Sequence, residues 1–412
     1  MASTRRYAYV TLITRASYLA GVVLLADTLR RHGSRHPLIV LYTPKLSADA
    51  VRALELEASR QNLILRKCEY LLPPGDTKIT LIAQRFEDTW TKLRVFELCV
   101  DFDVVCYLDA DMAIFNRNMD TIFEKVEREL PEEWLGANHC CVCNRDNDPW
   151  APADWHRENC AYTPVTHPGG LTEPTQPPPS REDGTDDDKD KDKDNLNPIA
   201  SLPEGPSRTH RLLNGGMFVF RPTTQLRDSL LDFFQTNTPL LSTFKFPDQD
   251  FLAHFFRGRW RALGWQYNAL KTMRYWHEGL WRDDEVVCLH YIVDKPWACR
   301  VTDEGVAGYK GRDGVTHRWW WDAYERWEEE RLGGGSSAST GSYIHTRGGG
   351  SSGESADDGD AGREVVALVR KGVAPPLGVS DGWFEGDDPD LQAIGASVQG
   401  FANNKVTSSS KD

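Results

Sequence analysis

The sequence of 412 residues lacks a net positive charge, a long apolar run and a dinucleotide-binding fingerprint. Its formal net charge of −13 argues against nucleic acid as the main partner, because that partner requires a basic surface. No stretch approaches the roughly 18 apolar residues of a membrane span, and the N-terminal segment does not have the pattern of a signal peptide. We therefore expect a cytoplasmic protein with no membrane span and no nucleic-acid partner. The absence of G-x-G-x-x-G leaves the usual dinucleotide-binding interpretation without support.

The nine cysteines are odd in number, and several stand in strand-like or core-like contexts, among them Cys99, Cys106 and Cys288. This usage is typical of reduced thiols in a cytosolic protein and not of a disulfide framework.

Strand-like and helix-like patterns alternate over residues 5 to about 165, which is typical of an α/β fold with a mostly parallel sheet and helices on both faces. The first helix is expected to begin at Ser17 and to stop at Gly33, and the second to begin at Ser47. We assign residues 5–330 to a single domain with a disordered Pro-, Asp- and Lys-rich insertion at 166–208. A flexible Gly/Ser-rich linker (331–363) and a short helix with a polar tail (364–412) follow.

The run CYLDADMAIF, from Cys106 to Phe115, carries Asp109 and Asp111 directly after an expected strand. Open parallel sheets bind ligands at the carboxyl ends of their strands. Residues i and i+2 of an extended chain point to the same side, where two bare carboxylates would be costly to desolvate. A divalent cation removes that cost, and oxygen ligands suit Mg²⁺ or Mn²⁺, which also hold phosphates. The pattern favours a metal–diphosphate site over a capping and a solvated aspartate.

Six motifs occur in the order found in glycosyltransferase family 8, which the chain resembles over about residues 7–165 and 209–325. They are YVTLITRASYLAGVVLLADTLRRH, TKLRVFEL, CYLDADMAIF, LNGGMFVFRP, FPDQDFLAHFF and HYIVDKPW. Within the family the pattern is most similar to the galactinol synthases, as shown by HCCVCNRDNDPW, DQDFL and RWWWDAYERW. The resemblance implies a GT-A fold, a UDP-sugar donor, Mn²⁺ with Mg²⁺ as the alternative, and transfer with retention of anomeric configuration.

The resemblance also assigns roles to residues. It makes Asp109, Asp111 and His290 the metal ligands, and it places Lys295 where an ammonium neutralises charge on the leaving UDP. The segment between His290 and Lys295 departs from the family, because it is shorter and lacks the family's glycine. The donor-binding residues that the resemblance implies are Thr11, Ile13, Thr14, Tyr18, Lys92, Asp109, Ala110, Asn214, Gly215, Asp248 and Lys295.

The catalytic residues implied in the same way are Asp248, Gln249 and Lys92. Asp248 would bind sugar hydroxyls and Gln249 would lie near the anomeric carbon, although acidic residues at a helix start also serve as caps. The sequence leaves open whether a covalent carboxylate intermediate forms or whether the acceptor attacks on the same face. Asn214, Gly215 and Gly216 are expected to form a turn that lets the backbone approach the sugar.

The acceptor should meet the two aromatic regions that lie outside these motifs, HCCVCNRDNDPW and RWWWDAYERW. We interpret Cys140, Cys141, Cys143 and the later Cys160 as free thiols on that side. The alternative is a structural zinc ion held by these cysteines with His139, although the spacing fits no standard zinc finger.

The leading hypothesis is a retaining hexosyltransferase that moves galactose or glucose from a UDP-sugar to a small polyol such as myo-inositol, or to a glycan. The alternatives are a glycogenin-like self-glucosylating primer and a catalytically silent sugar-nucleotide-binding scaffold. A homodimer is left open.

Overall fold

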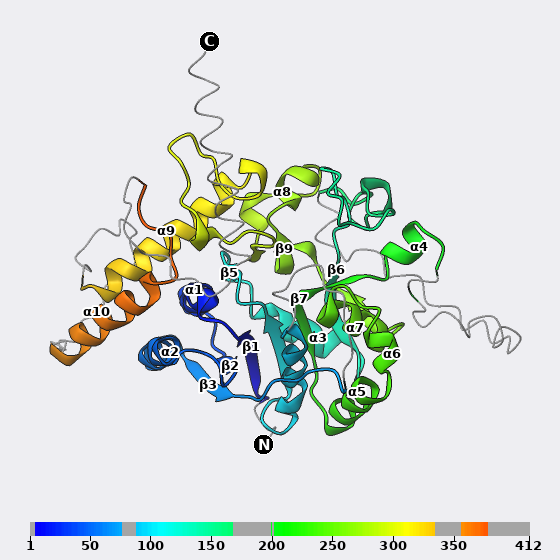
Figure 1. Cartoon of the computed structure of the whole chain (residues 1–412), viewed down its shortest axis with the longest axis horizontal. Coiled ribbons are helices and arrows are strands. Elements are labelled where there is room, and N and C mark those ends of the chain that lie inside the picture. The colour runs from blue at the N-terminus through cyan, green and yellow to red at the C-terminus, as the bar shows by residue number, and fades with distance from the viewer. Residues whose placement is uncertain (1–4, 76–87, 168–198, 200–201, 334–355, 378–412) are drawn as a thin grey trace, which may run out of the picture.

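The computed structural model describes residues 5–75, 88–167, 199, 202–333 and 356–377 (Figure 1). The strands are β1 (Tyr7–Ile13), β2 (Leu38–Tyr42), β3 (Leu63–Lys67), β4 (Val104–Leu108), β5 (Met112–Ile114), β6 (Leu135–His139), β7 (Leu213–Phe220), β8 (Trp260–Ala262), β9 (Ala269–Leu270) and β10 (Cys288–His290). The α-helices are α1 (Leu19–Arg31), α2 (Ala48–Gln61), α3 (Thr121–Glu129), α4 (Pro206–Thr209), α5 (Thr224–Thr236), α6 (Thr238–Leu241), α7 (Pro247–Phe255), α8 (Met273–Trp276), α9 (Gly314–Arg331) and α10 (Ala356–Arg370). The 3₁₀ helices are η1 (Ala16–Tyr18), η3 (Thr89–Val100), η4 (Arg157–Asn159), η7 (Trp265–Asn268), η8 (Asp283–Glu285), η9 (Pro296–Ala298) and η10 (Tyr309–Gly311).

A seven-stranded sheet in the order β3-β2-β1-β4-β7-β6-β8 forms the centre of the molecule. Strand β1 runs parallel to β2 and β4, β2 runs parallel to β3, and β6 runs parallel to β8. Strand β7 runs antiparallel to both of its neighbours, β4 and β6. All residues of β4 are buried, as expected for a central strand covered on both faces. The predicted α/β fold with a mostly parallel sheet is confirmed.

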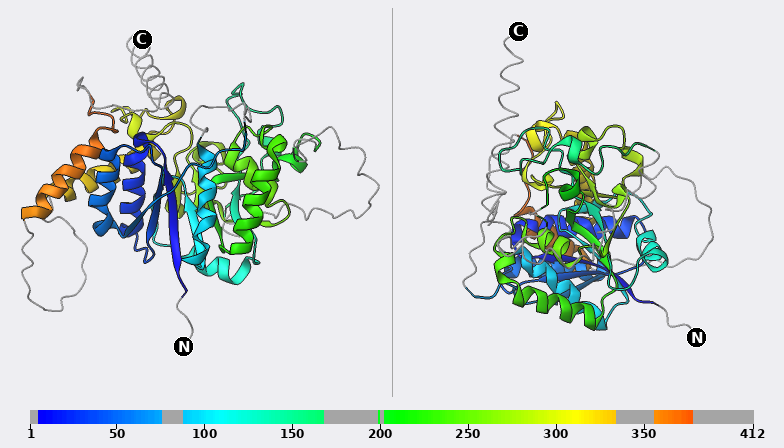
Figure 2. Two further views of the ribbon diagram at one scale, coloured as in Figure 1. Left: turned by 60° about the horizontal axis from the view of Figure 1, so that its bottom comes forward. Right: turned by 90° about the vertical axis from the view of Figure 1, so that its right-hand side faces the viewer.

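Helices enclose a hydrophobic core on each face of this sheet (Figure 2). One core joins α1, α2, α3 and α9 and contains Leu24, Phe123 and Trp327. The other joins η3, α5 and α7 and contains Trp90 and Phe251. Within the described part of the chain, no helix combines the length and the apolar character needed to cross a bilayer.

A second, three-stranded sheet in the order β5-β10-β9 begins just beyond the end of β4. Strand β10 pairs antiparallel with β5, so that His290 lies opposite Met112, and it pairs parallel with β9. This pairing brings a segment from late in the sequence to the carboxyl end of β4.

Two predictions of helix starts have different outcomes. Ser47 caps α2 as predicted, because its hydroxyl oxygen accepts a hydrogen bond from the amide of Ala50 at 3.3 Å. Ser17 was wrongly predicted to begin α1. It lies inside the 3₁₀ turn η1, and α1 follows Tyr18 without a side-chain cap. A short 3₁₀ turn tightens the chain here before the α-helix starts.

The C-terminal boundaries also differ from the prediction. Helix α9 ends at Arg331, next to the predicted domain end at residue 330, and α10 begins at Ala356, inside the range predicted as a linker. It packs beside α2 and α9 (Figures 1 and 2) through the buried Val365 and Val366. Burial of this apolar stripe stabilises α10, which therefore begins earlier than the short helix predicted within residues 364–412. The rest of the predicted linker and tail lies outside the described residues, apart from residues 332–333 and 371–377.

The predicted disordered insertion, 166–208, lies outside the described residues at 168–198 and 200–201. At its end the structure describes Ile199, which is buried, and residues 202–208, where α4 begins at Pro206. The predicted boundary was therefore too late. Arg208 of α4 holds Asp154 at 2.7 Å, so this end of the segment is anchored to the domain.

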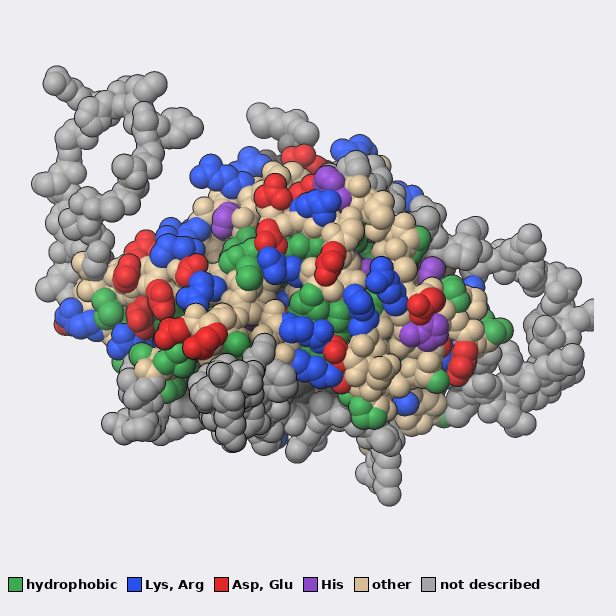
Figure 3. All heavy atoms as spheres, turned by 90° about the horizontal axis from the view of Figure 1, so that it is seen from above, with side chains coloured by type: hydrophobic (Ala, Val, Ile, Leu, Met, Phe, Trp, Pro, Cys, Tyr) green, Lys and Arg blue, Asp and Glu red, His purple; other side chains and the backbone are tan. Residues whose placement is uncertain are grey.

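Charged side chains of both signs are mixed over the face seen from above in Figure 3, around hydrophobic side chains near its middle.

Candidate active site

Strand β4 delivers two aspartates to the edge of the large sheet. After Leu108 the chain leaves β4 in a tight turn, in which the amide of Asp109 donates to the carbonyl of Gly216 at 2.8 Å. The amide of Met112 donates back to the carbonyl of Asp109 at 3.2 Å, and β5 begins there. The turn thus holds Asp109, Ala110 and Asp111 between β4 of the large sheet and β5 of the small one. Asp109 and Asp111 directly follow a strand, as predicted from the sequence.

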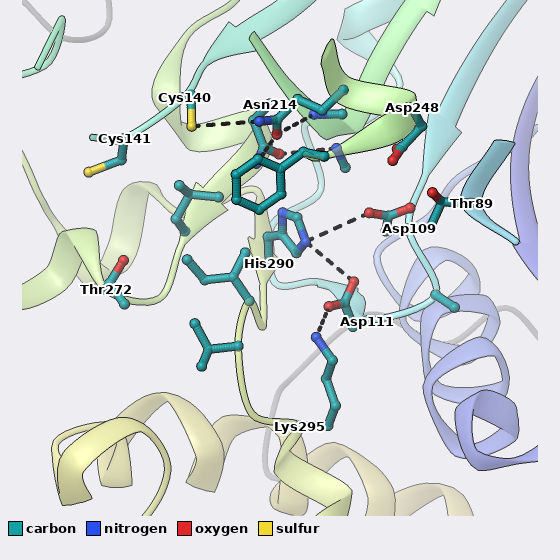
Figure 4. Close-up of a pocket in the computed structure, with 18 of the residues that line it drawn as sticks. Thr89, Asp109, Asp111, Cys140, Cys141, Asn214, Asp248, Thr272, His290 and Lys295 are labelled. Atoms are coloured by element: carbon teal, nitrogen blue, oxygen red, sulfur yellow. Dashed lines mark hydrogen bonds and ion pairs between the residues drawn. The ribbon is translucent and has the colours of Figure 1, made fainter. Parts of the chain in front are cut away.

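His290 meets both aspartates because β10 pairs with β5 (Figure 4). Its Nε2 lies 3.3 Å from Oδ1 of Asp111 and 4.0 Å from Oδ2 of Asp109. One ligand atom from each of the three residues lies within 4.8 Å of the other two. Two carboxylates and one imidazole suit Mn²⁺, and the oxygens suit Mg²⁺. The structure therefore brings the three predicted ligands together as a candidate metal site.

Asn268, which the sequence did not single out, orients the imidazole. Its Oδ1 lies 2.9 Å from Nδ1 of His290. A side-chain carbonyl oxygen accepts, so Nδ1 carries the proton and Nε2 keeps its lone pair for a metal. Asn268 in turn donates to Oδ1 of Asn214 at 2.9 Å. No local pattern in the sequence marks this residue, since its role depends on the packing of η7 against β10.

Lys92 links the candidate metal site to α7. Its Nζ lies 2.9 Å from Asp109 and 2.5 Å from Asp248, and it donates to the carbonyl of Gly215 at 3.0 Å. Burial lowers the pKa of Lys92, but the two carboxylates outweigh burial and hold the pKa above its ordinary value. Lys92 is therefore a buried ammonium and not a solvated surface lysine.

Lys295 reaches the same centre in spite of the shortened segment before it. Its ammonium contacts the carboxylate of Asp111 and donates to the carbonyl of Tyr291 at 2.9 Å. Burial raises the pKa of Asp111, but the ammonium of Lys295 outweighs burial and holds that pKa well below its usual range.

The shortened segment places Val293 at a φ of +70°, in the left-handed region. A β-branched residue rarely adopts this region, and glycine adopts it freely. The adjacent Asp294 turns away from the pocket to Lys271, at 2.6 Å. Its negative charge is therefore paired with Lys271 and does not neutralise the positive charge of Lys295.

The expected turn at Asn214, Gly215 and Gly216 is wrong, because all three residues belong to β7. The pairing of β7 with β6 shifts register between Ala137 and Asn138, so the segment bulges out of that ladder. At Gly216 an added Cβ would lie 2.1 Å from Cε1 of His290. The imidazole leaves no room for a side chain at this position of β7, so the site also requires glycine at residue 216.

Helix α7 presents Asp248 and Gln249 to the pocket. The capping role that the sequence left as an alternative belongs to Asp250, whose Oδ2 accepts from the amides of Lys245 and Phe246 at 2.9 and 3.0 Å. Oε1 of Gln249 accepts from the amide of Gly215 at 3.2 Å.

Of the donor-binding residues predicted on and after the first strand, some line the pocket and others do not. The pocket has a volume of about 400 Å³, and Thr14 and Tyr18 line it. The side chains of Thr11 and Ile13 are buried in the sheet and do not line it. The ring of Tyr18 also packs edge-on against that of Trp297, with the ring centroids 5.8 Å apart.

One of the two aromatic regions expected to meet the acceptor lines the pocket. Residues from the first region that do so are Cys140, Cys141, Asn144, Asp148 and Trp150. Trp155, Phe246, Trp276 and Tyr309 complete this side. The prediction that the second region meets the acceptor is wrong. None of its residues lines the pocket, because Trp320 and Trp327 of α9 are buried in the core.

Comparisons with known proteins show which proteins the chain is similar to. Residues 188–300 match the model of glycosyl transferase family 8. Galactinol synthase 2 of Solanum lycopersicum is 27% identical over 324 residues, which cover 77% of this chain and 80% of the relative. Galactinol synthase 6 of Arabidopsis thaliana is 26% identical with the same coverage. These matches support a glycosyltransferase of family 8, and the pattern of the chain is similar to that of the galactinol synthases.

Solved structures are also similar to this chain, at lower identity. The galactosyltransferase LgtC, in complex with donor and acceptor sugar analogues, is 14% identical, with a TM-score of 0.48, covering 77% of this chain and 95% of that one. The glycosyltransferase GlyE of Streptococcus pneumoniae is 15% identical, with a TM-score of 0.44, covering 79% of this chain and 64% of that one.

Proposed function

We propose that this enzyme transfers galactose from UDP-galactose to a small polyol, with myo-inositol the best single candidate, in the presence of Mn²⁺ and with retention of configuration. The observation that supports this most is the convergence of Asp109, Asp111 and His290 with two buried lysines in one pocket. The relatives named galactinol synthases support the choice of acceptor and donor.

Asp109, Asp111 and His290 would hold the metal ion, which when bound offsets the charge of the donor diphosphate. Lys295, whose ammonium already lies at Asp111, would neutralise charge that develops on the leaving UDP. Asn268 keeps His290 in the tautomer that leaves Nε2 unprotonated. Lys92 holds Asp248 in place, and Asp248 would accept hydrogen bonds from the sugar hydroxyls.

The charges in the pocket support same-face attack over a covalent intermediate. Asp248 is the carboxylate beside the expected sugar, and Lys92 pairs with it at 2.5 Å. A carboxylate held in a buried ion pair is a weak nucleophile, because attack on the sugar would consume the negative charge that Lys92 stabilises there. In same-face transfer the leaving phosphate oxygen takes the proton of the acceptor hydroxyl.

The acceptor would lie against the aromatic side of the pocket. Trp155 stacks on Phe246 with ring centroids 5.8 Å apart, and Tyr309 donates its hydroxyl hydrogen to Asp148. An aromatic face packs on the C–H face of a ring polyol, while polar groups nearby meet its hydroxyls.

Incubation with UDP-galactose, Mn²⁺ and myo-inositol tests the proposal, with a hexosyl-inositol detected by mass as the expected product. UDP-glucose and a panel of polyols and glycans should turn over more slowly. Formation of no hexosyl-inositol while another donor or acceptor turns over would overturn the galactinol assignment. Hexose added to the protein itself without acceptor would support the self-glucosylating alternative, and no UDP release with any donor would support the silent scaffold.

Asp111→Asn tests the metal site directly. It keeps the shape of the side chain and removes a ligand charge, so we expect UDP release to fall by at least about 100-fold. Asp228→Asn is the control, since that aspartate lies on α5 with 60% of its side chain exposed. Full activity of Asp111→Asn in excess EDTA would contradict the metal model.

A further inference from the structure

Four metal-ligating side chains from three distant segments meet beside the acceptor side of the pocket. Cys141 and Cys143 follow β6, Cys160 follows η4, and His277 follows α8. Their ligand atoms all lie within 4.8 Å of one another. The sulfur of Cys141 points away from His290 and the aspartates, so this cluster is separate from the candidate metal site described above (Figure 4).

The distances within the cluster match those of a tetrahedral zinc site. Nε2 of His277 lies 3.3 Å from Sγ of Cys141, 3.2 Å from Sγ of Cys143 and 3.6 Å from Sγ of Cys160. The Sγ atoms of Cys141 and Cys160 are 3.9 Å apart. Zinc–sulfur bonds of about 2.3 Å and zinc–nitrogen bonds of about 2.05 Å at tetrahedral angles give S···N separations of about 3.6 Å and S···S separations of about 3.8 Å.

Hydrogen bonding alone does not account for three sulfurs around one nitrogen. An imidazole nitrogen either carries one proton or offers one lone pair, so it serves one partner well. A disulfide does not account for the cluster either, since 3.9 Å is far beyond the S–S bond length of about 2.05 Å. A cation at the centre satisfies all four groups at once.

The surroundings are those of a structural site. Cys143 and Cys160 are each 1% exposed, His277 is 5% exposed and Cys141 is 8% exposed. Four protein ligands leave no open position for a substrate, which is characteristic of structural and not catalytic zinc.

We propose that Cys141, Cys143, Cys160 and His277 bind a structural Zn²⁺. The ion links the loop after β6 to α8, two segments that carry Asp148 and Trp276 of the acceptor side. This differs from the sequence interpretation, which favoured free thiols and, for a metal, named His139. His139 instead packs its ring against Trp260 at 4.9 Å, and Sγ of Cys140 faces Nε2 of Gln249 at 3.9 Å.

Metal analysis of the full chain, expressed with supplementary zinc and dialysed against a weak chelator, tests the proposal. We expect about one zinc per chain in the wild type, near zero in Cys143→Ser and His277→Gln, and one in the matched control Cys140→Ser. Cys140 is buried and adjacent to the cluster but outside it. Zinc near zero in the wild type, or equal zinc in Cys140→Ser and Cys143→Ser, would overturn the proposal.

X-ray absorption at the zinc edge on the wild-type protein covers the case in which the variants do not fold. Three sulfurs at about 2.3 Å and one nitrogen at about 2.0 Å are expected, and a shell of oxygen and nitrogen alone would overturn the assignment. Asp111→Asn should keep its zinc while losing transfer activity, which separates this site from the catalytic metal.

Discussion

Replacing Lys271 with methionine should lower the free energy of unfolding by more than replacing any charged surface residue. Lys271 follows β9 and is fully buried. Its Nζ lies 2.6 Å from Oδ1 of Asp294 and 2.7 Å from Oδ2 of Asp313, and both carboxylates are buried. Methionine fills the same space but leaves these two negative charges without their cation.

Breaking a buried ion pair by removing one partner costs about 3–5 kcal/mol. We expect a loss of this size in the free energy of unfolding at pH 8. Burial raises the pKa of Asp313, so protonation of this carboxyl should relieve part of the loss at lower pH. Because one pH unit corresponds to about 1.4 kcal/mol, the difference from the wild type should shrink between pH 8 and pH 5.

Urea unfolding followed by tryptophan fluorescence measures the effect. With a urea dependence of about 3 kcal/mol per molar, the midpoint should fall by about 1–1.7 M at pH 8. Lys371→Met is the matched control, since Lys371 pairs with Asp49 at 2.6 Å but has 53% of its side chain exposed, and its midpoint should stay close to that of the wild type. The double variant Lys271→Met/Asp313→Asn should recover part of the loss. A midpoint shift for Lys271→Met no larger than that of the control would refute the reasoning.

Three other changes give separate tests. Lys92→Met should lower kcat/KM for UDP release by about 100-fold, since it removes the ammonium between Asp109 and Asp248, and a loss below tenfold would contradict this role. Burial lowers the pKa of His317 to about 3, below its unfolded value of about 6.5, so stability should rise with pH between those values and level off above 6.5. His317→Gln should therefore reduce the difference in urea midpoint between pH 5 and pH 7, and an unchanged difference would show that other groups control it. Val293→Gly should be about 1 kcal/mol more stable than Val293→Ala in the same assay, because the φ of +70° strains any side chain, and the reverse order would exclude strain at this position.

Local sequence patterns were sufficient for the framework of the fold. Apolar runs of strand length, helical periodicity between them and a cap at Ser47 determined the order of the first strands and helices. The position of Asp109 and Asp111 after an apolar run was sufficient to place them at the carboxyl edge of a sheet. These features depend on neighbours within a few residues, and such interactions act in the same way wherever the segment lies in the fold.

Sequence patterns gave wrong predictions where the same local pattern is compatible with two different structures. The Asn214–Gly216 segment has the composition of a turn, yet it continues β7 as a bulged strand, because Gly216 must pass beside His290. The aromatic residues of α9 have the chemistry of a sugar-binding wall, yet they fill the core, because α9 packs against α1 and α10. Which solution applies was decided by the element that packs on the segment.

Contacts between distant segments were decided by the tertiary structure alone. Asn268 reaches His290, Lys271 reaches Asp313, and His277 reaches Cys143 from 134 residues away. The sequence analysis grouped the cysteines with His139, whereas the structure brings His277 beside them, since spacing along the chain carries no information about which loop a distant helix will meet. Their meeting depends on the packing of whole elements, whose free energy is gained only once the sheet and its helices are assembled.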